Sequence, residues 1–335
     1  MTISERAMGL MRTASHHADS TSLGRFQLPA ALGAEGGQLV VAGNVDSLTT
    51  FTNNETVTLG SGGNLRNAPA SQVSRLVVQG TQLELAPGAN FRTQLPLNLA
   101  ERYPDFTFIV GMNGRLRLGA GAWLNTTNDA AIEPGGEVIV RGSQSLWQHE
   151  ADNTTGAQSR LLVGSEEAAP NDPAAVLVID QGGRVETETM VMDQTSVEAV
   201  SGHVKLASGG SLRVSGALDS RAAGQQIDVD AATLEVGEMA YAGKVAVGNG
   251  GTATFSRSNS SVADLRAVFT DLPQQTTPGT IFLQSSFNLA VESSFTGTVR
   301  PLQPVTISNA AALRAATVEL TRDRKRTARA HGADR

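Results

Sequence analysis

Residues 204–214 read VKLASGGSLRV. Apolar and polar side chains alternate before the turn and again after it, which is typical of short β-strands with one buried side. The apolar positions are Val204, Leu206, Leu212 and Val214. The Ser-Gly-Gly between the two halves predicts a tight corner, because glycine adopts positive φ angles at little cost. The segment therefore predicts two strands joined by a turn, with their charged residues on the outer side.

The same pattern recurs at least eight times from about residue 36 to residue 255. The final glycines of the turns stand at positions 37, 63, 88, 114, 136, 183, 210 and 251, and the gaps between them are 22–27 residues except for two of 47 and 41. These two gaps are close to twice the others. A sustained period of about 20–27 residues without amphipathic helices is typical of stacked β-coils. We therefore expect an all-β fold, a parallel β-helix (β-solenoid), right-handed and three-faced, with small terminal caps.

The repeat divides the chain into four parts. Residues 1–35 lack alternation and are expected to be an N-terminal segment, partly disordered or a cap. Residues 36–255 hold the repeats, and residues 256–307 are expected to form C-terminal coils or a cap that covers the open sheet edge. Residues 308–335 form a basic tail, helical or disordered, for which a last strand over 316–321 is an open alternative.

Several segments interrupt the alternation inside the repeats. Residues 92–106, 143–160 and 166–173 are expected to be loops extruded from the coil. Such insertions usually gather on one face of a solenoid and often form its binding face. Residues 262–270 are expected to form a short helix.

The sequence from 161 to 187, LLVGSEEAAPNDPAAVLVIDQGGRVET, resembles the Gly-rich repeat of bacterial autotransporter passenger domains, as do residues 204–214 and 245–255. The resemblance implies a right-handed β-helix that serves as a surface adhesin or display rod. We identify neither a signal peptide nor the amphipathic strands of a translocator barrel. The chain is therefore expected to be a passenger fragment, extracellular or at the bacterial cell surface as part of a larger exported protein, or a coil put to another use.

Residues 147–152, WQHEAD, form the best local cluster of aromatic and titratable groups. An aromatic ring can stack on a sugar, and the neighbouring polar groups can bind its hydroxyls. The weak binding candidates are Trp147, His149, Glu150 and Asp152, together with Tyr103. Glycoside hydrolysis needs two facing carboxylates about 5–9.5 Å apart, and no such catalytic set is identified. Trp123 lies in a coil-like stretch and is expected to pack in the core.

Composition restricts the classes of ligand. The chain has no Cys, which excludes a disulfide scaffold and thiolate metal sites. We expect no cofactor and no metal site. The formal net charge is −6, although the last fifteen residues carry six basic against two acidic residues. An acidic body repels phosphate backbones, so nucleic acid is not an expected partner. No apolar run is long enough to span a bilayer.

These observations lead to one functional hypothesis and two alternatives. The first is a non-enzymatic structural or adhesive surface protein, similar to an autotransporter passenger, that presents the loops near 92–106 and 143–173 to a surface glycan or protein. The second is a phage tail-spike or fibre-like virion component, which would often be a trimer. The third is a polysaccharide lyase or glycoside hydrolase built on a β-helix. The sequence leaves open whether the chain is a monomer or a trimer.

Overall fold

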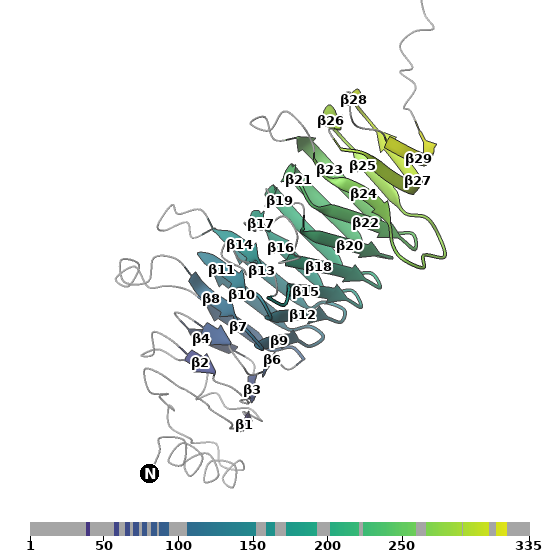
Figure 1. Ribbon diagram of the computed structural model, residues 1–335. Helices are drawn as coiled ribbons and strands as arrows, with labels where there is room; N and C mark the ends of the chain where they lie inside the picture. The colour runs from purple at the N-terminus through teal and green to yellow at the C-terminus, as the bar shows by residue number, and fades with distance from the viewer. Residues whose placement is uncertain are drawn as a thin grey trace, which may run out of the picture.

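The computed structural model is an elongated stack of short strands that runs from β1 at one end to β29 at the other (Figure 1). It describes residues 38–40, 57–59, 64–67, 70–73, 76–78, 82–85, 87–93, 106–151, 159–164, 172–192, 202–220, 224–258, 266–289, 291–307 and 313–319. All pairs between the named strands are parallel and join one coil to the next. The predicted all-β parallel β-helix is thereby confirmed.

The strands form three ladders, which we call faces 1, 2 and 3. Face 1 contains β1 (Gln38–Val40), β3 (Asn64–Asn67), β6 (Gln82–Leu85), β9 (Arg115–Leu118), β12 (Glu137–Arg141), β15 (Ala175–Asp180), β18 (Gly202–Ala207), β20 (Gln226–Asp230), β22 (Lys244–Gly248), β24 (Val268–Asp271) and the first halves of β27 (Ser293–Pro301) and β29 (Leu313–Val318). At about 4.8 Å per coil, this ladder is roughly 50 Å long.

The other two faces continue each coil. Face 2 contains β4 (Ala70–Val73), β7 (Asn90–Thr93), β10 (Trp123–Thr127), β13 (Leu146–Glu150), β16 (Arg184–Thr187), the first halves of β19 (Ser211–Ser220), β21 (Thr233–Tyr241) and β23 (Thr252–Ser258), then β25 (Thr280–Leu283) and the second halves of β27 and β29. Face 3 contains β2 (Val57–Leu59), β5 (Leu76–Val78), β8 (Phe106–Val110), β11 (Asp129–Ile132), β14 (Arg160–Val163), β17 (Thr189–Val191) and the second halves of β19, β21 and β23. β26 (Phe287–Leu289) and β28 (Val305–Ile307) pair separately.

The core consists of inward side chains that stack on one another in register. One column on face 1 comprises Leu83, Leu116, Val138, Leu177, Val204, Ile227, Val245 and Phe269, all buried. Because successive strand residues point to opposite sides, the apolar half of each alternating segment faces this column. Each coil buries its apolar side against the coils above and below, so no coil is expected to be stable alone.

The glycine-rich turns serve two physical purposes. Gly250 has a φ of 76° and nothing near its missing Cβ, so it is needed for its left-handed backbone. At positions 114, 136, 183, 210 and 251 the final glycine of the turn is needed for space instead, whereas Gly88 has a φ of 74° and open space around its missing Cβ. A side chain at Gly210 would place its Cβ 2.1 Å from the carbonyl oxygen of Ile179 in the preceding coil. The spacing of these final glycines therefore reports where adjacent coils come closest.

The two long gaps between glycines have different origins. The 41-residue gap from Gly210 to Gly251 contains two coils, as its length predicts, because Ser211 pairs with Thr233 and Thr233 with Thr252. The 47-residue gap does not contain two coils. Gly136 precedes β12, and Gly183 follows β15, which pairs directly with β12. The gap therefore holds one coil and one additional face 1 strand, and that coil is lengthened by residues between its strands.

The C-terminal part continues the β-structure. Residues 268–271 form β24 rather than the end of the helix expected over 262–270, and residues 259–265 lie outside the described part. β29 begins at residue 313, which agrees with a last strand rather than with a helix beginning at 308. Residues 1–35 and 320–335 also lie outside the described residues. Within the described part of the chain, no helix long and apolar enough to cross a membrane is found.

Candidate functional site

The segment expected to be a loop at residues 143–160 is largely part of the coil. β13 is a strand of face 2 that lies between β10 and β16, so the prediction of an extruded loop is wrong over these residues. Only residues 152–158 of this segment fall outside the described part, as do residues 94–105 and 166–171 of the other two expected loops. Two of the binding candidates, Asp152 and Tyr103, therefore lie outside the described residues.

Each of the two tryptophans lies on the side opposite to the one expected for it. Trp147 is 0% exposed and packs edge-on against Phe108, with 5.7 Å between the ring centroids. His149 is 2% exposed on the same inner side. Trp123, expected to pack in the core, instead lies in the outward column of face 2 and is partly exposed. Glu150 is exposed. The aromatic ring available to a surface ligand is thus that of Trp123.

Hydrogen bonds around His149 form a single directed chain. Trp147 Nε1 donates to Thr126 Oγ1 over 2.9 Å, and Thr126 Oγ1 lies 2.8 Å from His149 Nδ1. Ser159 Oγ donates to the carbonyl oxygen of Asn128 over 2.7 Å and lies 2.9 Å from His149 Nε2. Because the Ser159 proton is already used, His149 donates from Nε2 and accepts the Thr126 hydroxyl at Nδ1. His149 is therefore the neutral Nε2–H tautomer.

Burial keeps His149 neutral. Desolvation of the imidazolium lowers the pKa of His149 from 6.5 to about 4, because its effect is larger than the opposite effect of the backbone hydrogen bonds.

The contact between His149 and Ser159 has the distance of a nucleophile–base pair. Yet Ser159 is buried, its proton is committed to a backbone carbonyl, and the Nδ1 partner of His149 is a hydroxyl instead of a carboxylate. This arrangement is suited to holding the chain in place.

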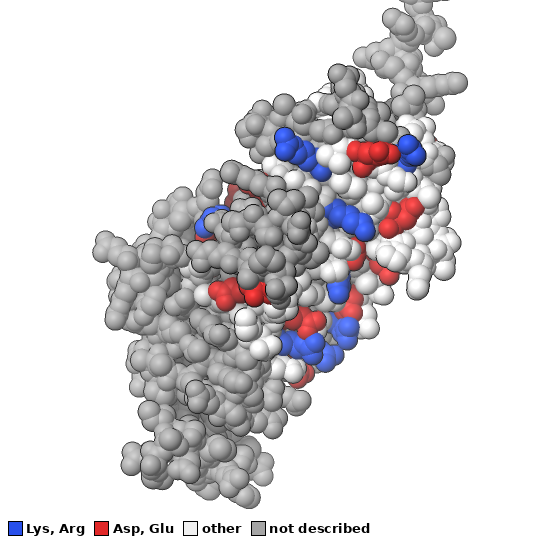
Figure 2. All heavy atoms as spheres, in the orientation of Figure 1, with Lys and Arg blue, Asp and Glu red and all other residues white. Residues whose placement is uncertain are grey.

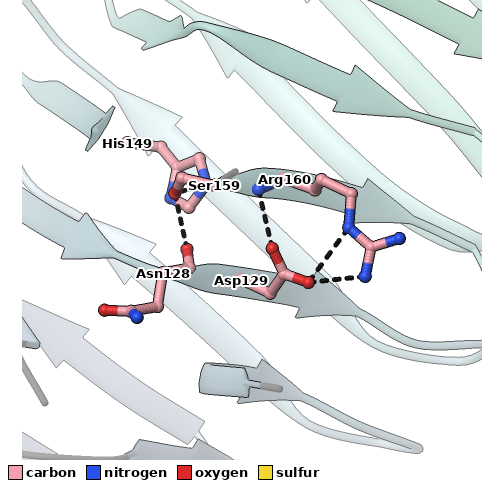
Figure 3. A network of polar contacts seen from close by, with 5 residues as sticks. All are labelled: Asn128, Asp129, His149, Ser159 and Arg160. Atoms are coloured by element: carbon pink, nitrogen blue, oxygen red, sulfur yellow. Dashed lines mark hydrogen bonds and ion pairs between the residues drawn. The ribbon is translucent and has the colours of Figure 1, made fainter. Parts of the chain in front are cut away.

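An Arg–Asp ion pair lies beside this network (Figure 3). The backbone N–H of Arg160 donates to Asp129 Oδ1 over 2.8 Å, and its guanidinium donates to Asp129 Oδ2 from Nε at 3.0 Å and from Nη2 at 2.6 Å. Asp129 is nearly buried, so its charge needs these three donors. Arg160 and Ser159 come directly after residues 152–158, and His149 lies just before them. Both stems of that segment are therefore tied to the preceding coil.

A second Arg–Asp pair, which is bidentate, joins the same two coils on face 1. Arg141 Nε donates to Asp180 Oδ1 over 2.8 Å and Nη2 donates to Oδ2 over 2.6 Å. The hydrogen bond and charge of Asp180 raise the pKa of Arg141. β15, which carries Asp180, follows residues 165–171. Each of the two insertions of this long coil is thus followed by a strand that an Arg–Asp pair anchors to the coil before.

The inner side of face 2 carries a polar column along four successive coils. Thr93, Thr126, His149 and Thr187 are paired in register, and all four are buried. In the next coils the same column continues with Val214, Val236, Phe255 and Leu283. The interior therefore changes from polar to apolar along the rod, and the polar part coincides with the coils that carry the insertions.

One further pair of titratable groups lies on the outer side of face 1. His203 Nε2 is 2.7 Å from Asp228 Oδ2, and Gln226 Nε2 donates to Asp228 Oδ1 over 2.8 Å. Burial raises the pKa of Asp228, but hydrogen bonds from His203 and Gln226 outweigh it, so the pKa is lowered overall. The pair is an inter-coil contact that the sequence did not indicate, because its members are 25 residues apart.

Charges on the outer surface are mixed. Figure 2 shows basic and acidic side chains side by side on the described residues of the visible face, without a large patch of one sign. Several are opposite-sign pairs between adjacent coils, such as Arg115 with Glu137 and Arg257 with Glu238. Among the described residues of that face, basic side chains form no continuous stripe of the kind that binds a phosphate backbone.

Comparisons with known proteins give a likeness in structure but none in sequence. No family model matches the chain, and no curated protein matches it. Among solved structures, it is similar to the crystal structure of the TibC-catalyzed hyper-glycosylated TibA55-350 fragment, with 12% sequence identity, a TM-score of 0.23, and coverage of 86% of this chain and 97% of that chain. A TM-score this low establishes nothing by itself, and the β-helix follows from the strand pairing above.

Sequence reasoning found the right coil but missed most of the network. Trp147, His149 and Glu150 were singled out, whereas Thr126, Ser159 and the two Arg–Asp pairs were not. Apart from the Ser159–His149 contact, their partners lie 21 to 39 residues away and become neighbours only when coils stack. A signal was present in the repeat, because Arg141 and Asp180 each follow an alternating apolar segment at the same position of their coils.

Proposed function

We propose that this protein is a non-enzymatic structural or adhesive surface protein whose β-helical rod presents inserted segments to a partner. The observation that carries the proposal is the placement of the insertions. Residues 94–105 and 152–158 connect face 2 to face 3, and residues 165–171 and 193–201 connect face 3 to face 1. Between β9 and β23, the corner from face 1 to face 2 is closed by turns of only two to four residues. Insertions therefore flank face 3 and avoid the opposite edge.

The anchored stems support the same proposal. A presented segment binds better when its ends are held, because less conformational entropy is lost on binding. The stems of residues 152–158 are held by the contacts of His149, Ser159 and Arg160 described above. Those side chains are engaged with one another, which favours a structural role over acid–base catalysis.

The test removes the insertions and keeps the coil. Residues 152–158 and 165–171 are each replaced by two glycines in the full chain, and binding of the labelled protein to bacterial and epithelial cells is measured. The matched control is Gln181→Asn with Ser208→Asn, on the corner without insertions, where asparagine suits the positive φ angles of 51° and 49°. We expect about tenfold weaker binding for the deletions alone.

Two results would overturn the proposal. One is cell binding that the deletions leave unchanged although circular dichroism shows folded protein. The other is release of reducing ends or unsaturated products from a polysaccharide, which would make the protein an enzyme.

Light scattering over a concentration series distinguishes the virion alternative from the adhesive rod. A stable trimer would favour the tail-spike hypothesis, and a monomer would favour the adhesive rod.

A further inference from the structure

The outer side of face 2 carries a short strip of aromatic, amide and charged side chains around Trp123. In one column Asn90, Trp123, Leu146 and Arg184 lie in register on four successive coils, and in the next column Arg92, Asn125, Gln148 and Glu186 do the same. Trp123 is partly exposed and lies beside the apolar Leu146. We define these eight residues with Glu150 as the Trp123 strip.

Hydrogen bonds hold the centre of this strip in one arrangement. Trp123 Nε1 donates to Gln148 Oε1 over 3.2 Å, and Gln148 Nε2 donates to Glu150 Oε1. Asn125 Nδ2 donates to the other oxygen, Glu150 Oε2, over 3.2 Å. The indole ring and the planar groups are thus oriented before any ligand arrives, which lowers the entropic cost of binding.

One acceptor in the strip has no partner among the described residues. Asn125 is 2% exposed although it lies in the outward column, and its Oδ1 is buried without a hydrogen bond. The orientation of the amide is set by Glu150, which accepts from Nδ2, so a flip would put the amide oxygen against the carboxylate. A buried acceptor without a donor costs about 1–3 kcal/mol. A hydroxyl group of a ligand beside Trp123 would supply that donor once it displaced the side chain that covers this oxygen.

The charges of the strip select among ligands. Arg92 and Arg184 balance Glu150 and Glu186, and Arg184 is already paired with Glu186. A strip without net charge offers no advantage to a polyanion. An extended peptide binds to a sheet through backbone hydrogen bonds at an edge, whereas the strip lies on a face whose backbone groups are used in the ladders.

We propose that the Trp123 strip binds a neutral, hydroxyl-rich glycan, with the apolar face of a sugar on the Trp123 ring and a sugar hydroxyl donating to Asn125 Oδ1. Glu150 and Gln148 position these two groups. The inference rests on the proposed adhesive function and deepens it by naming the ligand class. It moves the sugar-stacking residue from Trp147, in the core, to Trp123 on the surface.

The test uses the full chain and immobilised polysaccharides. A neutral glucan, mannan and galactan serve as probes, with heparin as the anionic comparison. We expect binding to at least one neutral polysaccharide, about tenfold weaker in Trp123→Ala and in Asn125→Ala. The matched control is Phe282→Ala, which removes another partly buried outward aromatic of face 2, six coils away, and should leave binding unchanged. Circular dichroism establishes that each variant is folded.

A second readout is the fluorescence of Trp123. Trp147→Phe leaves Trp123 as the single tryptophan of the chain, so its fluorescence should shift when the bound polysaccharide covers the ring. If that variant does not fold, Gln148→Ala, which frees the Trp123 ring without changing the core, should also weaken binding several-fold. A shift in the wild-type protein that persists in Trp123→Phe would overturn the proposal.

The outcomes separate this inference from the adhesive function. Binding to cells without binding to any neutral polysaccharide, or preferential binding to heparin, would overturn the glycan site and leave the adhesive proposal standing. Polysaccharide binding that needs Trp123 without any binding to cells would support the site and contradict the adhesive role.

Discussion

At the scale of the residue, His149 is the group whose chemistry depends most on its surroundings. It is held as the neutral tautomer between Thr126 and Ser159, and its pKa falls from 6.5 to about 4 because the imidazolium cannot be solvated in the core. Between these two pH values the unfolded chain binds a proton that the folded chain does not bind. The contribution of His149 to stability is therefore fully present above pH 6.5 and is lost as the pH falls toward 4.

The coils around His149 should consequently unfold more easily in acid. The loss between pH 7 and pH 4 should reach about 3 kcal/mol from this group. His149→Gln can accept at Oε1 and donate at Nε2, so it should reduce this dependence while keeping most of the stability at pH 7. Urea unfolding of both proteins at several pH values measures the difference. Identical pH dependence in the wild-type protein and His149→Gln would contradict this account.

At the scale of the element, ion pairs between strands matter where the carboxylate is nearly buried. Asp129 accepts three hydrogen bonds from Arg160, whereas Glu235 and Arg213, also in adjacent coils, are 4.0 Å apart and largely exposed. Exposed pairs contribute little because water solvates both charges, but a desolvated carboxylate depends on its donors. β14 should thus be held on β11 mainly at its first residue, where residues 152–158 end.

Substitution of Asp129 by Asn should loosen this junction. We expect a loss of about 2 kcal/mol in stability and faster proteolysis within residues 152–158, because the stem is released from the preceding coil. Glu235→Gln, the matched control, should change neither quantity measurably. Urea unfolding and limited proteolysis followed by mass spectrometry provide the readouts. Equal proteolysis rates in the two variants would show that the Asp129–Arg160 pair does not hold the stem.

At the scale of the whole molecule, the rod is a one-dimensional stack in which each coil depends on its neighbours. Its stability need not be uniform, because local opening follows local packing. The coils of residues 202–258 have short turns between faces 1 and 2, and their core column on face 2 is apolar, with Val214, Val236 and Phe255. The coils of residues 90–192 carry the polar column and the insertions at residues 94–105, 152–158 and 165–171.

Hydrogen exchange should therefore divide the rod into two parts. Amides of β18 to β22 should exchange more slowly than those of β10 to β14, and the difference should widen when the pH is lowered toward 4 after correction for intrinsic exchange rates. Mass spectrometry of peptides from the full chain measures both regions in one experiment. Uniform protection along the rod would indicate that the polar column costs no local stability.

The parallel β-helix could be predicted from the sequence because its determinants are local: two-residue alternation, glycine turns and a repeat close to the length of one coil. Which tryptophan faces the core and which faces outward could not be predicted from the sequence. Trp123 precedes Leu124 and Trp147 follows Leu146, so each strand contains two adjacent apolar residues, and a shift of one residue exchanges the inner and outer sides. Only the stacking of coils selected Leu124 and Trp147 for the core. The same stacking brought His149, Ser159 and Asp129 together, because pairing between coils joins residues about twenty to forty positions apart, which no local pattern records.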